Sequence, residues 1–141
     1  MAIVYRVEDL DGNGPYQQRW KWADAGIEKP AFLRDVSDSN KYNPDPHPAP
    51  YEDGIENVDF EDVFGFRTLT MLGAWMLREK ADDADRLDQM GFQVGVYECL
   101  HEDVREGSRQ CVFRKKRAVK VRSMTLHDVL ERLPIPNELP G

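Results

Sequence analysis

The sequence predicts an α+β domain in which a mainly antiparallel sheet is covered by helices. Three short runs in the last third of the chain alternate apolar and polar residues, which is typical of half-buried strands. Three other segments carry apolar residues at helical spacing. The chain has 141 residues, 40% hydrophobic and 32% charged, so residues 1–141 are expected to form a single globular domain.

The strands are predicted from short apolar runs that end at turn signals. Because the last three runs follow one another closely, we expect them to pair as neighbours, with Val94, Val96, Val112 and Val119 facing inward. A strand near the beginning and one in the middle would complete the sheet. The predicted strands lie near residues 3–7, 63–67, 92–100, 109–114 and 118–124. Cys99 and Cys111 would lie on two of these strands, and we expect buried free thiols because no export signal precedes them.

The helices are predicted near residues 68–80, 82–90 and 125–133. Thr68 or Thr70 would cap the first, Asp82 or Asp83 the second, and Thr125 with Asp128 the third. Gly91 is expected to end the second helix in a left-handed conformation. The tail after residue 136 is expected to fray.

A long proline-rich and acidic loop is predicted at about residues 35–63. Prolines at alternate positions, 44 to 50, exclude both a helix and a central strand there. The segment before it, residues 16–35, carries aromatic residues at no regular spacing, which predicts a short helix or irregular structure. Six acidic residues close the loop: Glu52, Asp53, Glu56, Asp59, Glu61 and Asp62. Two interpretations stay open, a solvated loop or a surface that presents negative charge to a basic partner.

Charge is distributed unevenly along the chain. Residues 1–66 hold 14 acidic and 6 basic residues, within a net charge of −7, which disfavours nonspecific nucleic-acid binding. A basic hairpin follows: Arg114, Lys115, Lys116, Arg117, Lys120 and Arg122. Strand alternation would place Lys120 and Arg122 on one face. This patch could contact a phosphate or nucleic acid, or it could be solvated or paired with the acidic loop, and both interpretations stay open.

Several classes of protein are disfavoured. No apolar run approaches the roughly 20 residues that a membrane-spanning helix needs, and the first residues do not form an export signal, so a cytoplasmic protein is expected. The three histidines are scattered and there is no CxxC pair, so no metal site is predicted. No catalytic constellation and no cofactor motif can be identified.

The opening Tyr5-Arg6-Val7-Glu8-Asp9-x-Asp11-Gly12-x-Gly14-Pro15-Tyr16 is similar to the start of a family of small phage and prophage proteins. The similarity continues in patches over most of the chain: His47-Pro48, Phe64-Gly65-Phe66, Leu72-x-x-Trp75, Gly91-Phe92-x-Val94-x-Val96-Tyr97-Glu98 and Gln110-x-Val112-Phe113. The resemblance implies a phage origin and the cytoplasm of a host cell, but no particular activity.

A fainter similarity is to the ADP-ribosyltransferase fold. It implies that Arg6 would bind the phosphates of NAD and that Thr68 or Thr70 would support the ribose pocket. Gln110 falls where these enzymes carry the catalytic acid, and a neutral amide cannot stabilise an oxocarbenium ion as a carboxylate does. Glu98 or Glu106 would then have to replace it.

Two functional hypotheses follow. The first is a phage accessory protein without a cofactor that binds and inhibits or modulates a host protein through the acidic surface, for example an anti-defence or anti-CRISPR factor. Its partner would carry a basic, nucleic-acid-binding groove. The alternative is an NAD-dependent ADP-ribosyltransferase-like enzyme, or a relative that only binds NAD or ADP-ribose. A structural component of the virion is a third option.

Overall fold

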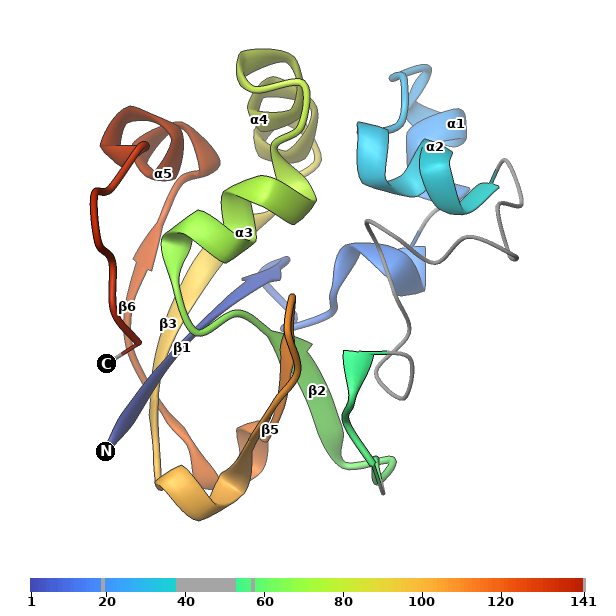
Figure 1. Cartoon of the computed structure of the whole chain (residues 1–141). Helices are drawn as coiled ribbons and strands as arrows, with labels where there is room; N and C mark the ends of the chain where they lie inside the picture. Colours follow the sequence, from blue (N-terminus) through green and yellow to red (C-terminus); the bar gives the residue numbers. More distant parts are fainter. Residues whose placement is uncertain (19, 38–52, 57, 141) are drawn as a thin grey trace.

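A computed structural model describes residues 1–18, 20–37, 53–56 and 58–140, with the backbone alone for 35–37. Over these residues, two small antiparallel sheets and five helices form an α+β fold, as predicted (Figure 1). The first sheet has the order β1-β3-β6, with β1 at Ala2–Glu8, β3 at Gln93–Cys99 and β6 at Val119–Met124. The second has the order β2-β5-β4, with β2 at Asp62–Gly65, β5 at Cys111–Arg114 and β4 at Val104–Glu106.

The prediction that the last three strands pair with their sequence neighbours is wrong. β3 pairs with β1 and β6, whereas β5 lies in the other sheet between β2 and β4. Alternation identifies a strand but not its partner, and the short strand β4, which was not predicted, carries the chain from one sheet to the other. Cys99 and Cys111 are nevertheless close in space, because both belong to one apolar cluster, and both are buried free thiols as expected.

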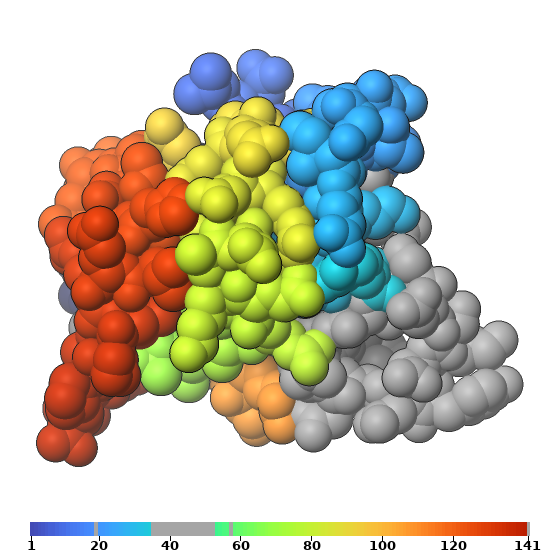
Figure 2. Space-filling view, turned by 90° about the horizontal axis from the view of Figure 1, so that it is seen from above, coloured from blue at the N-terminus to red at the C-terminus, as the bar shows by residue number. Residues whose placement is uncertain are grey.

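The helices cover one face of the first sheet. They are α1 at Trp20–Ala25, α2 at Ala31–Ser37, α3 at Leu69–Met76, α4 at Ala81–Gln89 and α5 at Leu126–Arg132. Short 3-10 turns lie at Pro15–Gln18, His101–Asp103 and Lys115–Arg117. Figure 2, which looks down on the helices, shows the red α5 segment, the yellow-green α3–α4 segment and the blue α1 segment side by side.

The first sheet is covered on both faces, so the molecule has two apolar cores. Val94, Val96 and Met124 pack with the helices in the larger core, where Trp22 stacks on Phe92 with 5.3 Å between ring centroids. The opposite face contributes Val4, Tyr97 and Cys99 to a smaller core, which Cys111 and Phe113 of β5 complete. Burial on both faces makes β3 almost continuously apolar.

The two sheets meet where β1 passes the end of β2. Tyr5 and Phe66 exchange two backbone hydrogen bonds of 2.8 Å there. A Cβ atom on Gly65 would lie 2.7 Å from Val4 Cγ1 and 2.9 Å from the carbonyl oxygen of Tyr5. The close approach of the strands therefore requires a residue without a side chain at position 65.

The helix ends confirm two of the three predicted caps. The Thr68 hydroxyl accepts from the Met71 N–H at 3.1 Å, and Thr125 and Asp128 form a capping box. Gly91 has the expected left-handed conformation, with φ at 81°. The prediction for α4 is wrong, because Lys80 occupies its N-cap without a side-chain bond. Asp83 lies inside that helix and instead accepts from the Ala31 N–H at 3.0 Å, which ties α2 to α4.

Two further expectations for β6 are wrong. Val119 was expected to face inward, but it is 61% exposed and lies opposite the partly exposed Glu98 of β3. Lys120 and Arg122 were expected on one face. A β-bulge makes them pair with Tyr97 and Val96, which are consecutive residues of β3, so their side chains lie on opposite faces.

Candidate functional site

The acidic run predicted to bind a partner divides into inward and outward residues. Glu52 lies outside the described residues. Asp53 is 8% exposed, and its carboxylate accepts from the backbone N–H groups of Arg109 and Gln110 at 2.8 and 3.1 Å. It therefore holds the turn between β4 and β5.

Asp59 and Asp62 build a tight turn at the start of β2. The Asp62 N–H donates to the Asp59 carbonyl at 3.0 Å, and the Asp59 N–H donates to the Asp62 carboxylate at 2.9 Å. The Glu61 N–H donates to the Asp59 carboxylate at 3.3 Å. Arg105 of β4 pairs with the buried Asp62 carboxylate and donates to the Glu56 carbonyl at 2.9 Å. The turn is thus fixed at both ends by charge-assisted bonds.

This turn displays a large apolar side chain. Phe60 is 93% exposed, and Val58 beside it is 46% exposed. Carboxylates lie on both sides, since Glu56 is exposed and Asp59 and Glu61 are partly exposed. We call the five residues Glu56, Val58, Asp59, Phe60 and Glu61 the Phe60 surface. A fully exposed aromatic residue on a rigid turn has the chemistry of an interface anchor.

Sequence reasoning found the carboxylates of this surface but missed Phe60 and Val58. The signal was present, because Phe60 stands between Asp59 and Glu61 and just before the alternating pattern of β2 begins.

Most residues of the predicted basic patch form ion pairs within the molecule. Lys115 and Lys120 lie 3.3 and 3.0 Å from the Glu8 carboxylate, and Arg117 lies 3.2 Å from Asp103. Arg114 approaches the acidic loop, at 3.9 Å from Asp59 and 4.0 Å from Asp62. Within the described part of the chain, Lys116 and Arg122 take part in no ion pair.

Glu8 is the centre of a buried charge cluster on the face of β1 that meets the smaller core. Its side chain is 3% exposed, and the Tyr97 hydroxyl donates to it at 2.7 Å. Arg6 lies 3.3 Å away and is 4% exposed. Burial alone would raise the pKa of Glu8, but the bonds from Tyr97 and Lys120 and the charge of Lys115 outweigh it and hold that pKa below its ordinary value. The Tyr97 pKa is raised by burial and by the Glu8 carboxylate, so the phenol keeps its proton.

The cluster gives a physical role to the opening motif. Arg6 donates to the carbonyls of Phe64 and Gly12 at 2.9 and 3.3 Å. Gly12 has φ at 84°, and a Cβ atom on Gly14 would lie 3.2 Å from the Arg6 guanidinium. Asp9 closes the loop by accepting from two backbone N–H groups at 2.9 Å. The turn after β1 thus wraps around the guanidinium of Arg6.

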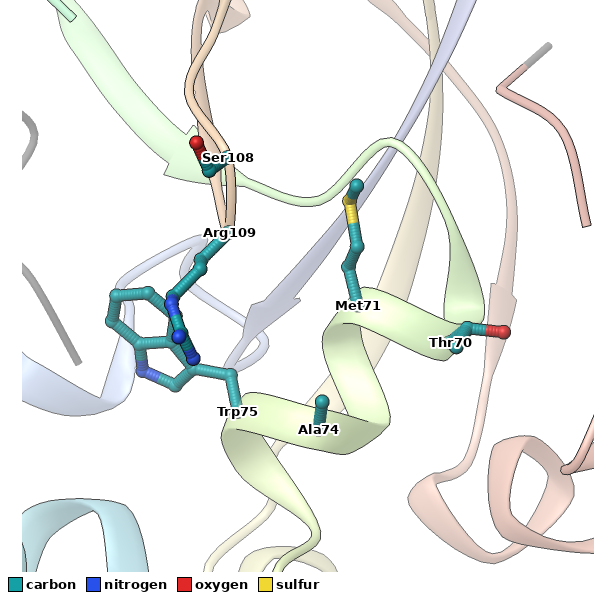
Figure 3. Close-up of a pocket in the computed structure, with 6 residues that line it drawn as sticks. All are labelled: Thr70, Met71, Ala74, Trp75, Ser108 and Arg109. Carbon is teal, nitrogen blue, oxygen red and sulfur yellow. The ribbon is translucent and has the colours of Figure 1, made fainter. Parts of the chain in front are cut away.

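An open pocket of about 360 Å³ lies between α3 and the turn that joins β4 to β5. Met71, Ala74 and Trp75 form its apolar side, and Ser108 and Arg109 its polar side. In Figure 3 the Arg109 side chain runs from the turn toward the Trp75 indole. That indole donates to the Tyr16 hydroxyl at 2.7 Å, and this hydrogen bond holds the apolar side of the pocket in place.

The residues of the ADP-ribosyltransferase alternative do not line this pocket, except Thr70. Arg6, Thr68 and Gln110 are each buried: Arg6 in the charge cluster, Thr68 at the cap of α3, and Gln110 beside Asp53. Glu106 pairs with Arg67 at 3.0 Å. The NAD alternative stays a prediction. In the described residues, no group of three or more His, Cys, Asp or Glu could hold a metal ion, and no helix has the length and apolarity of a membrane span.

Comparison with known proteins supports the phage relationship. No curated protein and no solved structure matches the chain significantly. The family model described as bacteriophage T4 Y00F protein matches residues 1–127, which include both sheets and the helices α1 to α4. The chain therefore belongs to the bacteriophage T4 Y00F protein family.

Proposed function

We propose that this phage-family protein is an accessory factor that binds a host protein in the cytoplasm through the Phe60 surface, and so inhibits or modulates it. An anti-defence factor, for example an anti-CRISPR, is one such role. The observation that carries the proposal is the 93% exposure of Phe60 on a turn that four polar contacts of its own carboxylates and Arg105 hold in place.

The rigidity of the turn favours binding. Ordering a mobile loop costs an interface about 0.5–1.5 kcal/mol for each immobilised side chain. Asp59 and Asp62 already fix the backbone around Phe60, so the backbone of the turn does not have to be ordered on binding. Burying a phenylalanine side chain contributes about 1.5–3 kcal/mol.

The charges beside Phe60 indicate the kind of partner. An aromatic ring with carboxylates on both sides matches a groove that combines an apolar pocket with basic side chains. Grooves that bind single-stranded nucleic acid have this composition, because they stack bases and neutralise phosphates. The proposed partner is therefore a host protein with a basic nucleic-acid-binding groove.

Affinity capture from a host lysate, followed by calorimetry with the purified partner, tests the proposal. Phe60→Ala should weaken binding by about 30-fold or more, since anchor residues contribute about 2 kcal/mol or more. Glu56→Gln with Glu61→Gln should also weaken it and should reduce its dependence on salt. Asp59 and Asp62 are left unchanged because they hold the turn.

Matched controls come from exposed positions elsewhere. Leu10 is 89% exposed, so Leu10→Ala removes a comparable apolar side chain outside the Phe60 surface. Asp24→Asn with Glu131→Gln removes two exposed charges on other elements. Both controls should bind as the wild type does. Equal loss of binding in Phe60→Ala and Leu10→Ala, or no loss in either, would refute the proposed surface.

A further inference from the structure

We infer that the outer edge of β6 binds an extended, acidic segment of another polypeptide as an added strand. Within the described residues, β6 pairs only with β3, so its other edge has no strand beside it. Five of its six residues are exposed, and Val119 and Val121 keep 61% and 46% of their surface in contact with solvent. The edge belongs to the first sheet, whereas the Phe60 surface precedes β2 in the second, so this inference does not depend on the proposed function.

The basic residues near this edge indicate which kind of strand would pair with it. Residues 107–127 contain seven basic residues and no acidic one. A second copy of β6 would place bases opposite bases, which is unfavourable in a cross-strand pair. A strand with carboxylates would gain from the same positions, and the backbone groups of the edge would supply hydrogen bonds.

The β-bulge in β6 predicts how the acidic residues are spaced in the bound segment. Lys120 and Arg122 are two residues apart, yet their partners on β3, Tyr97 and Val96, are consecutive. A strand in the corresponding register on the outer edge would likewise meet them with two consecutive residues, one on each face. We therefore expect two adjacent acidic residues rather than two that alternate with an apolar one.

The available cations fit a short peptide better than a nucleic acid. Lys120 binds Glu8 but keeps 41% of its side chain exposed, so a carboxylate of an added strand can also face it, whereas Arg117 binds Asp103. Only Lys116 and Arg122 of the basic patch lack an ion pair with the described residues, and β6 carries no aromatic residue on which a base could stack. The partly exposed Lys120, the Arg122 side chain without an ion pair to the described residues, and the two exposed valines of β6 suit an acidic strand with β-branched neighbours.

The test uses three probes against the full chain labelled with nitrogen-15. The first is a capped octapeptide, Thr-Val-Thr-Glu-Glu-Val-Thr-Val. The second has lysine in place of both glutamates, and the third is a 20-nucleotide single-stranded DNA. Amide chemical shifts and hydrogen exchange of residues 119–124 are followed during each titration. The acidic peptide should shift and protect amides of β6, while the lysine peptide and the DNA should leave them unchanged.

Variants separate the edge from general charge effects. Lys116→Glu with Arg122→Glu should weaken binding of the acidic peptide at least tenfold, and it breaks no ion pair among the described residues. Val119→Thr with Val121→Thr should weaken it several-fold while keeping β-branched residues. Lys29→Glu with Lys80→Glu makes the same change in net charge on the helical side and should bind as the wild type.

Four results would overturn the inference. They are equal binding of the lysine peptide, protection that maps outside β6, preferential binding of the DNA to β6, or self-association of the chain through β6 without any peptide. A melting temperature within a few degrees of the wild type establishes that each variant is folded. Loss of host-protein capture by Phe60→Ala would have no bearing on these results, so the two proposals can fail separately.

Discussion

At the scale of single residues, Glu8 stabilises the fold through its contacts with several buried or partly buried charges. Its carboxylate faces Arg6, Lys115, Lys120 and the Tyr97 hydroxyl within 3.3 Å, and it is 3% exposed. Three cations converge on one buried anion, so removing that anion would leave like charges facing each other in a site of low polarity.

Glu8→Gln should lower the free energy of unfolding by about 3–5 kcal/mol, the range found when one partner of a buried ion pair is removed. Tyr97→Phe keeps the charges and removes one hydrogen bond to a charged group, so it should cost about 1.5–3 kcal/mol. Urea denaturation followed by circular dichroism measures both. A Glu8→Gln variant no less stable than Tyr97→Phe would contradict this account of the cluster.

The depressed pKa of Glu8 predicts how stability depends on pH. Because the folded-state pKa lies below the ordinary value of 4.5, the unfolded chain takes up this proton first on acidification. The stabilisation is therefore complete above about pH 4.5 and decreases as the pH falls through the folded-state pKa. Urea titrations between pH 7 and pH 3 should show a steeper loss in the wild type than in Glu8→Gln. Parallel curves would exclude Glu8 as the cause.

At the scale of elements, the C-terminal tail binds the N-terminal end of helix α3. The Glu138 carboxylate accepts from the N–H groups of Leu69 and Thr70 at 2.8 Å and from the Thr70 hydroxyl at 2.7 Å. A negative charge at this end of a helix also interacts favourably with the helix dipole. The expectation that this tail frays is therefore wrong at Glu138.

Glu138→Gln should destabilise the protein by about 1 kcal/mol, because it removes the charge and weakens bonds to the first turn of α3. The effect should shrink in 1 M salt, where charges are screened. Thermal unfolding at low and high salt measures it. Glu131→Gln, on the exposed side of α5, is the control and should change the melting temperature by less than a degree or two.

The sequence predicted the positions of the helices and strands better than the pairing of the strands. Periodicity located the strands β1, β2, β3, β5 and β6 and the helices α3 to α5, and the caps at Thr68 and Thr125 followed from local chemistry. Strand pairing depends on contacts far apart in the chain, which alternation does not encode, so neither the division of these strands into two sheets nor the short strand β4 was predicted. The bulge in β6 likewise arises from pairing with β3, and it changed which face Arg122 occupies.

The candidate site could be predicted only in part for the same reason. The sequence marks Asp53 and Asp62 as acidic, but their burial depends on backbone and side-chain partners near residues 105–110. Phe60 is exposed because the turn of Asp59 and Asp62 points it away from both cores. Neither fact can be read from composition or spacing.

At the scale of the whole molecule, the two cores are separated by the first sheet. Cys99 and Cys111 lie in the smaller core between the sheets. Burial raises the pKa of Cys99 to about 11 and that of Cys111 to about 12, so neither thiol ionises in the folded protein near neutral pH.

Both thiols should therefore resist a thiol-specific reagent such as DTNB in the native state and should react fully in denaturant. Their native-state labelling rates should be similar to each other, because either cysteine is reached only when the two sheets separate. Labelling kinetics resolved by mass spectrometry measure this. Rapid labelling of one cysteine at pH 7 without denaturant would show that the smaller core opens locally instead.

The absence of a side chain at Gly65 also affects the two proposed contact surfaces. Because β1 and β2 touch there backbone to backbone, the sheet that carries the β6 edge and the sheet that follows Phe60 have little freedom to slide past each other. A ligand long enough to reach both would meet them at one fixed separation. Its second contact would then form at an effective concentration set by that distance and by the length and stiffness of the ligand between its two contacts, with no rearrangement of the protein between the two steps.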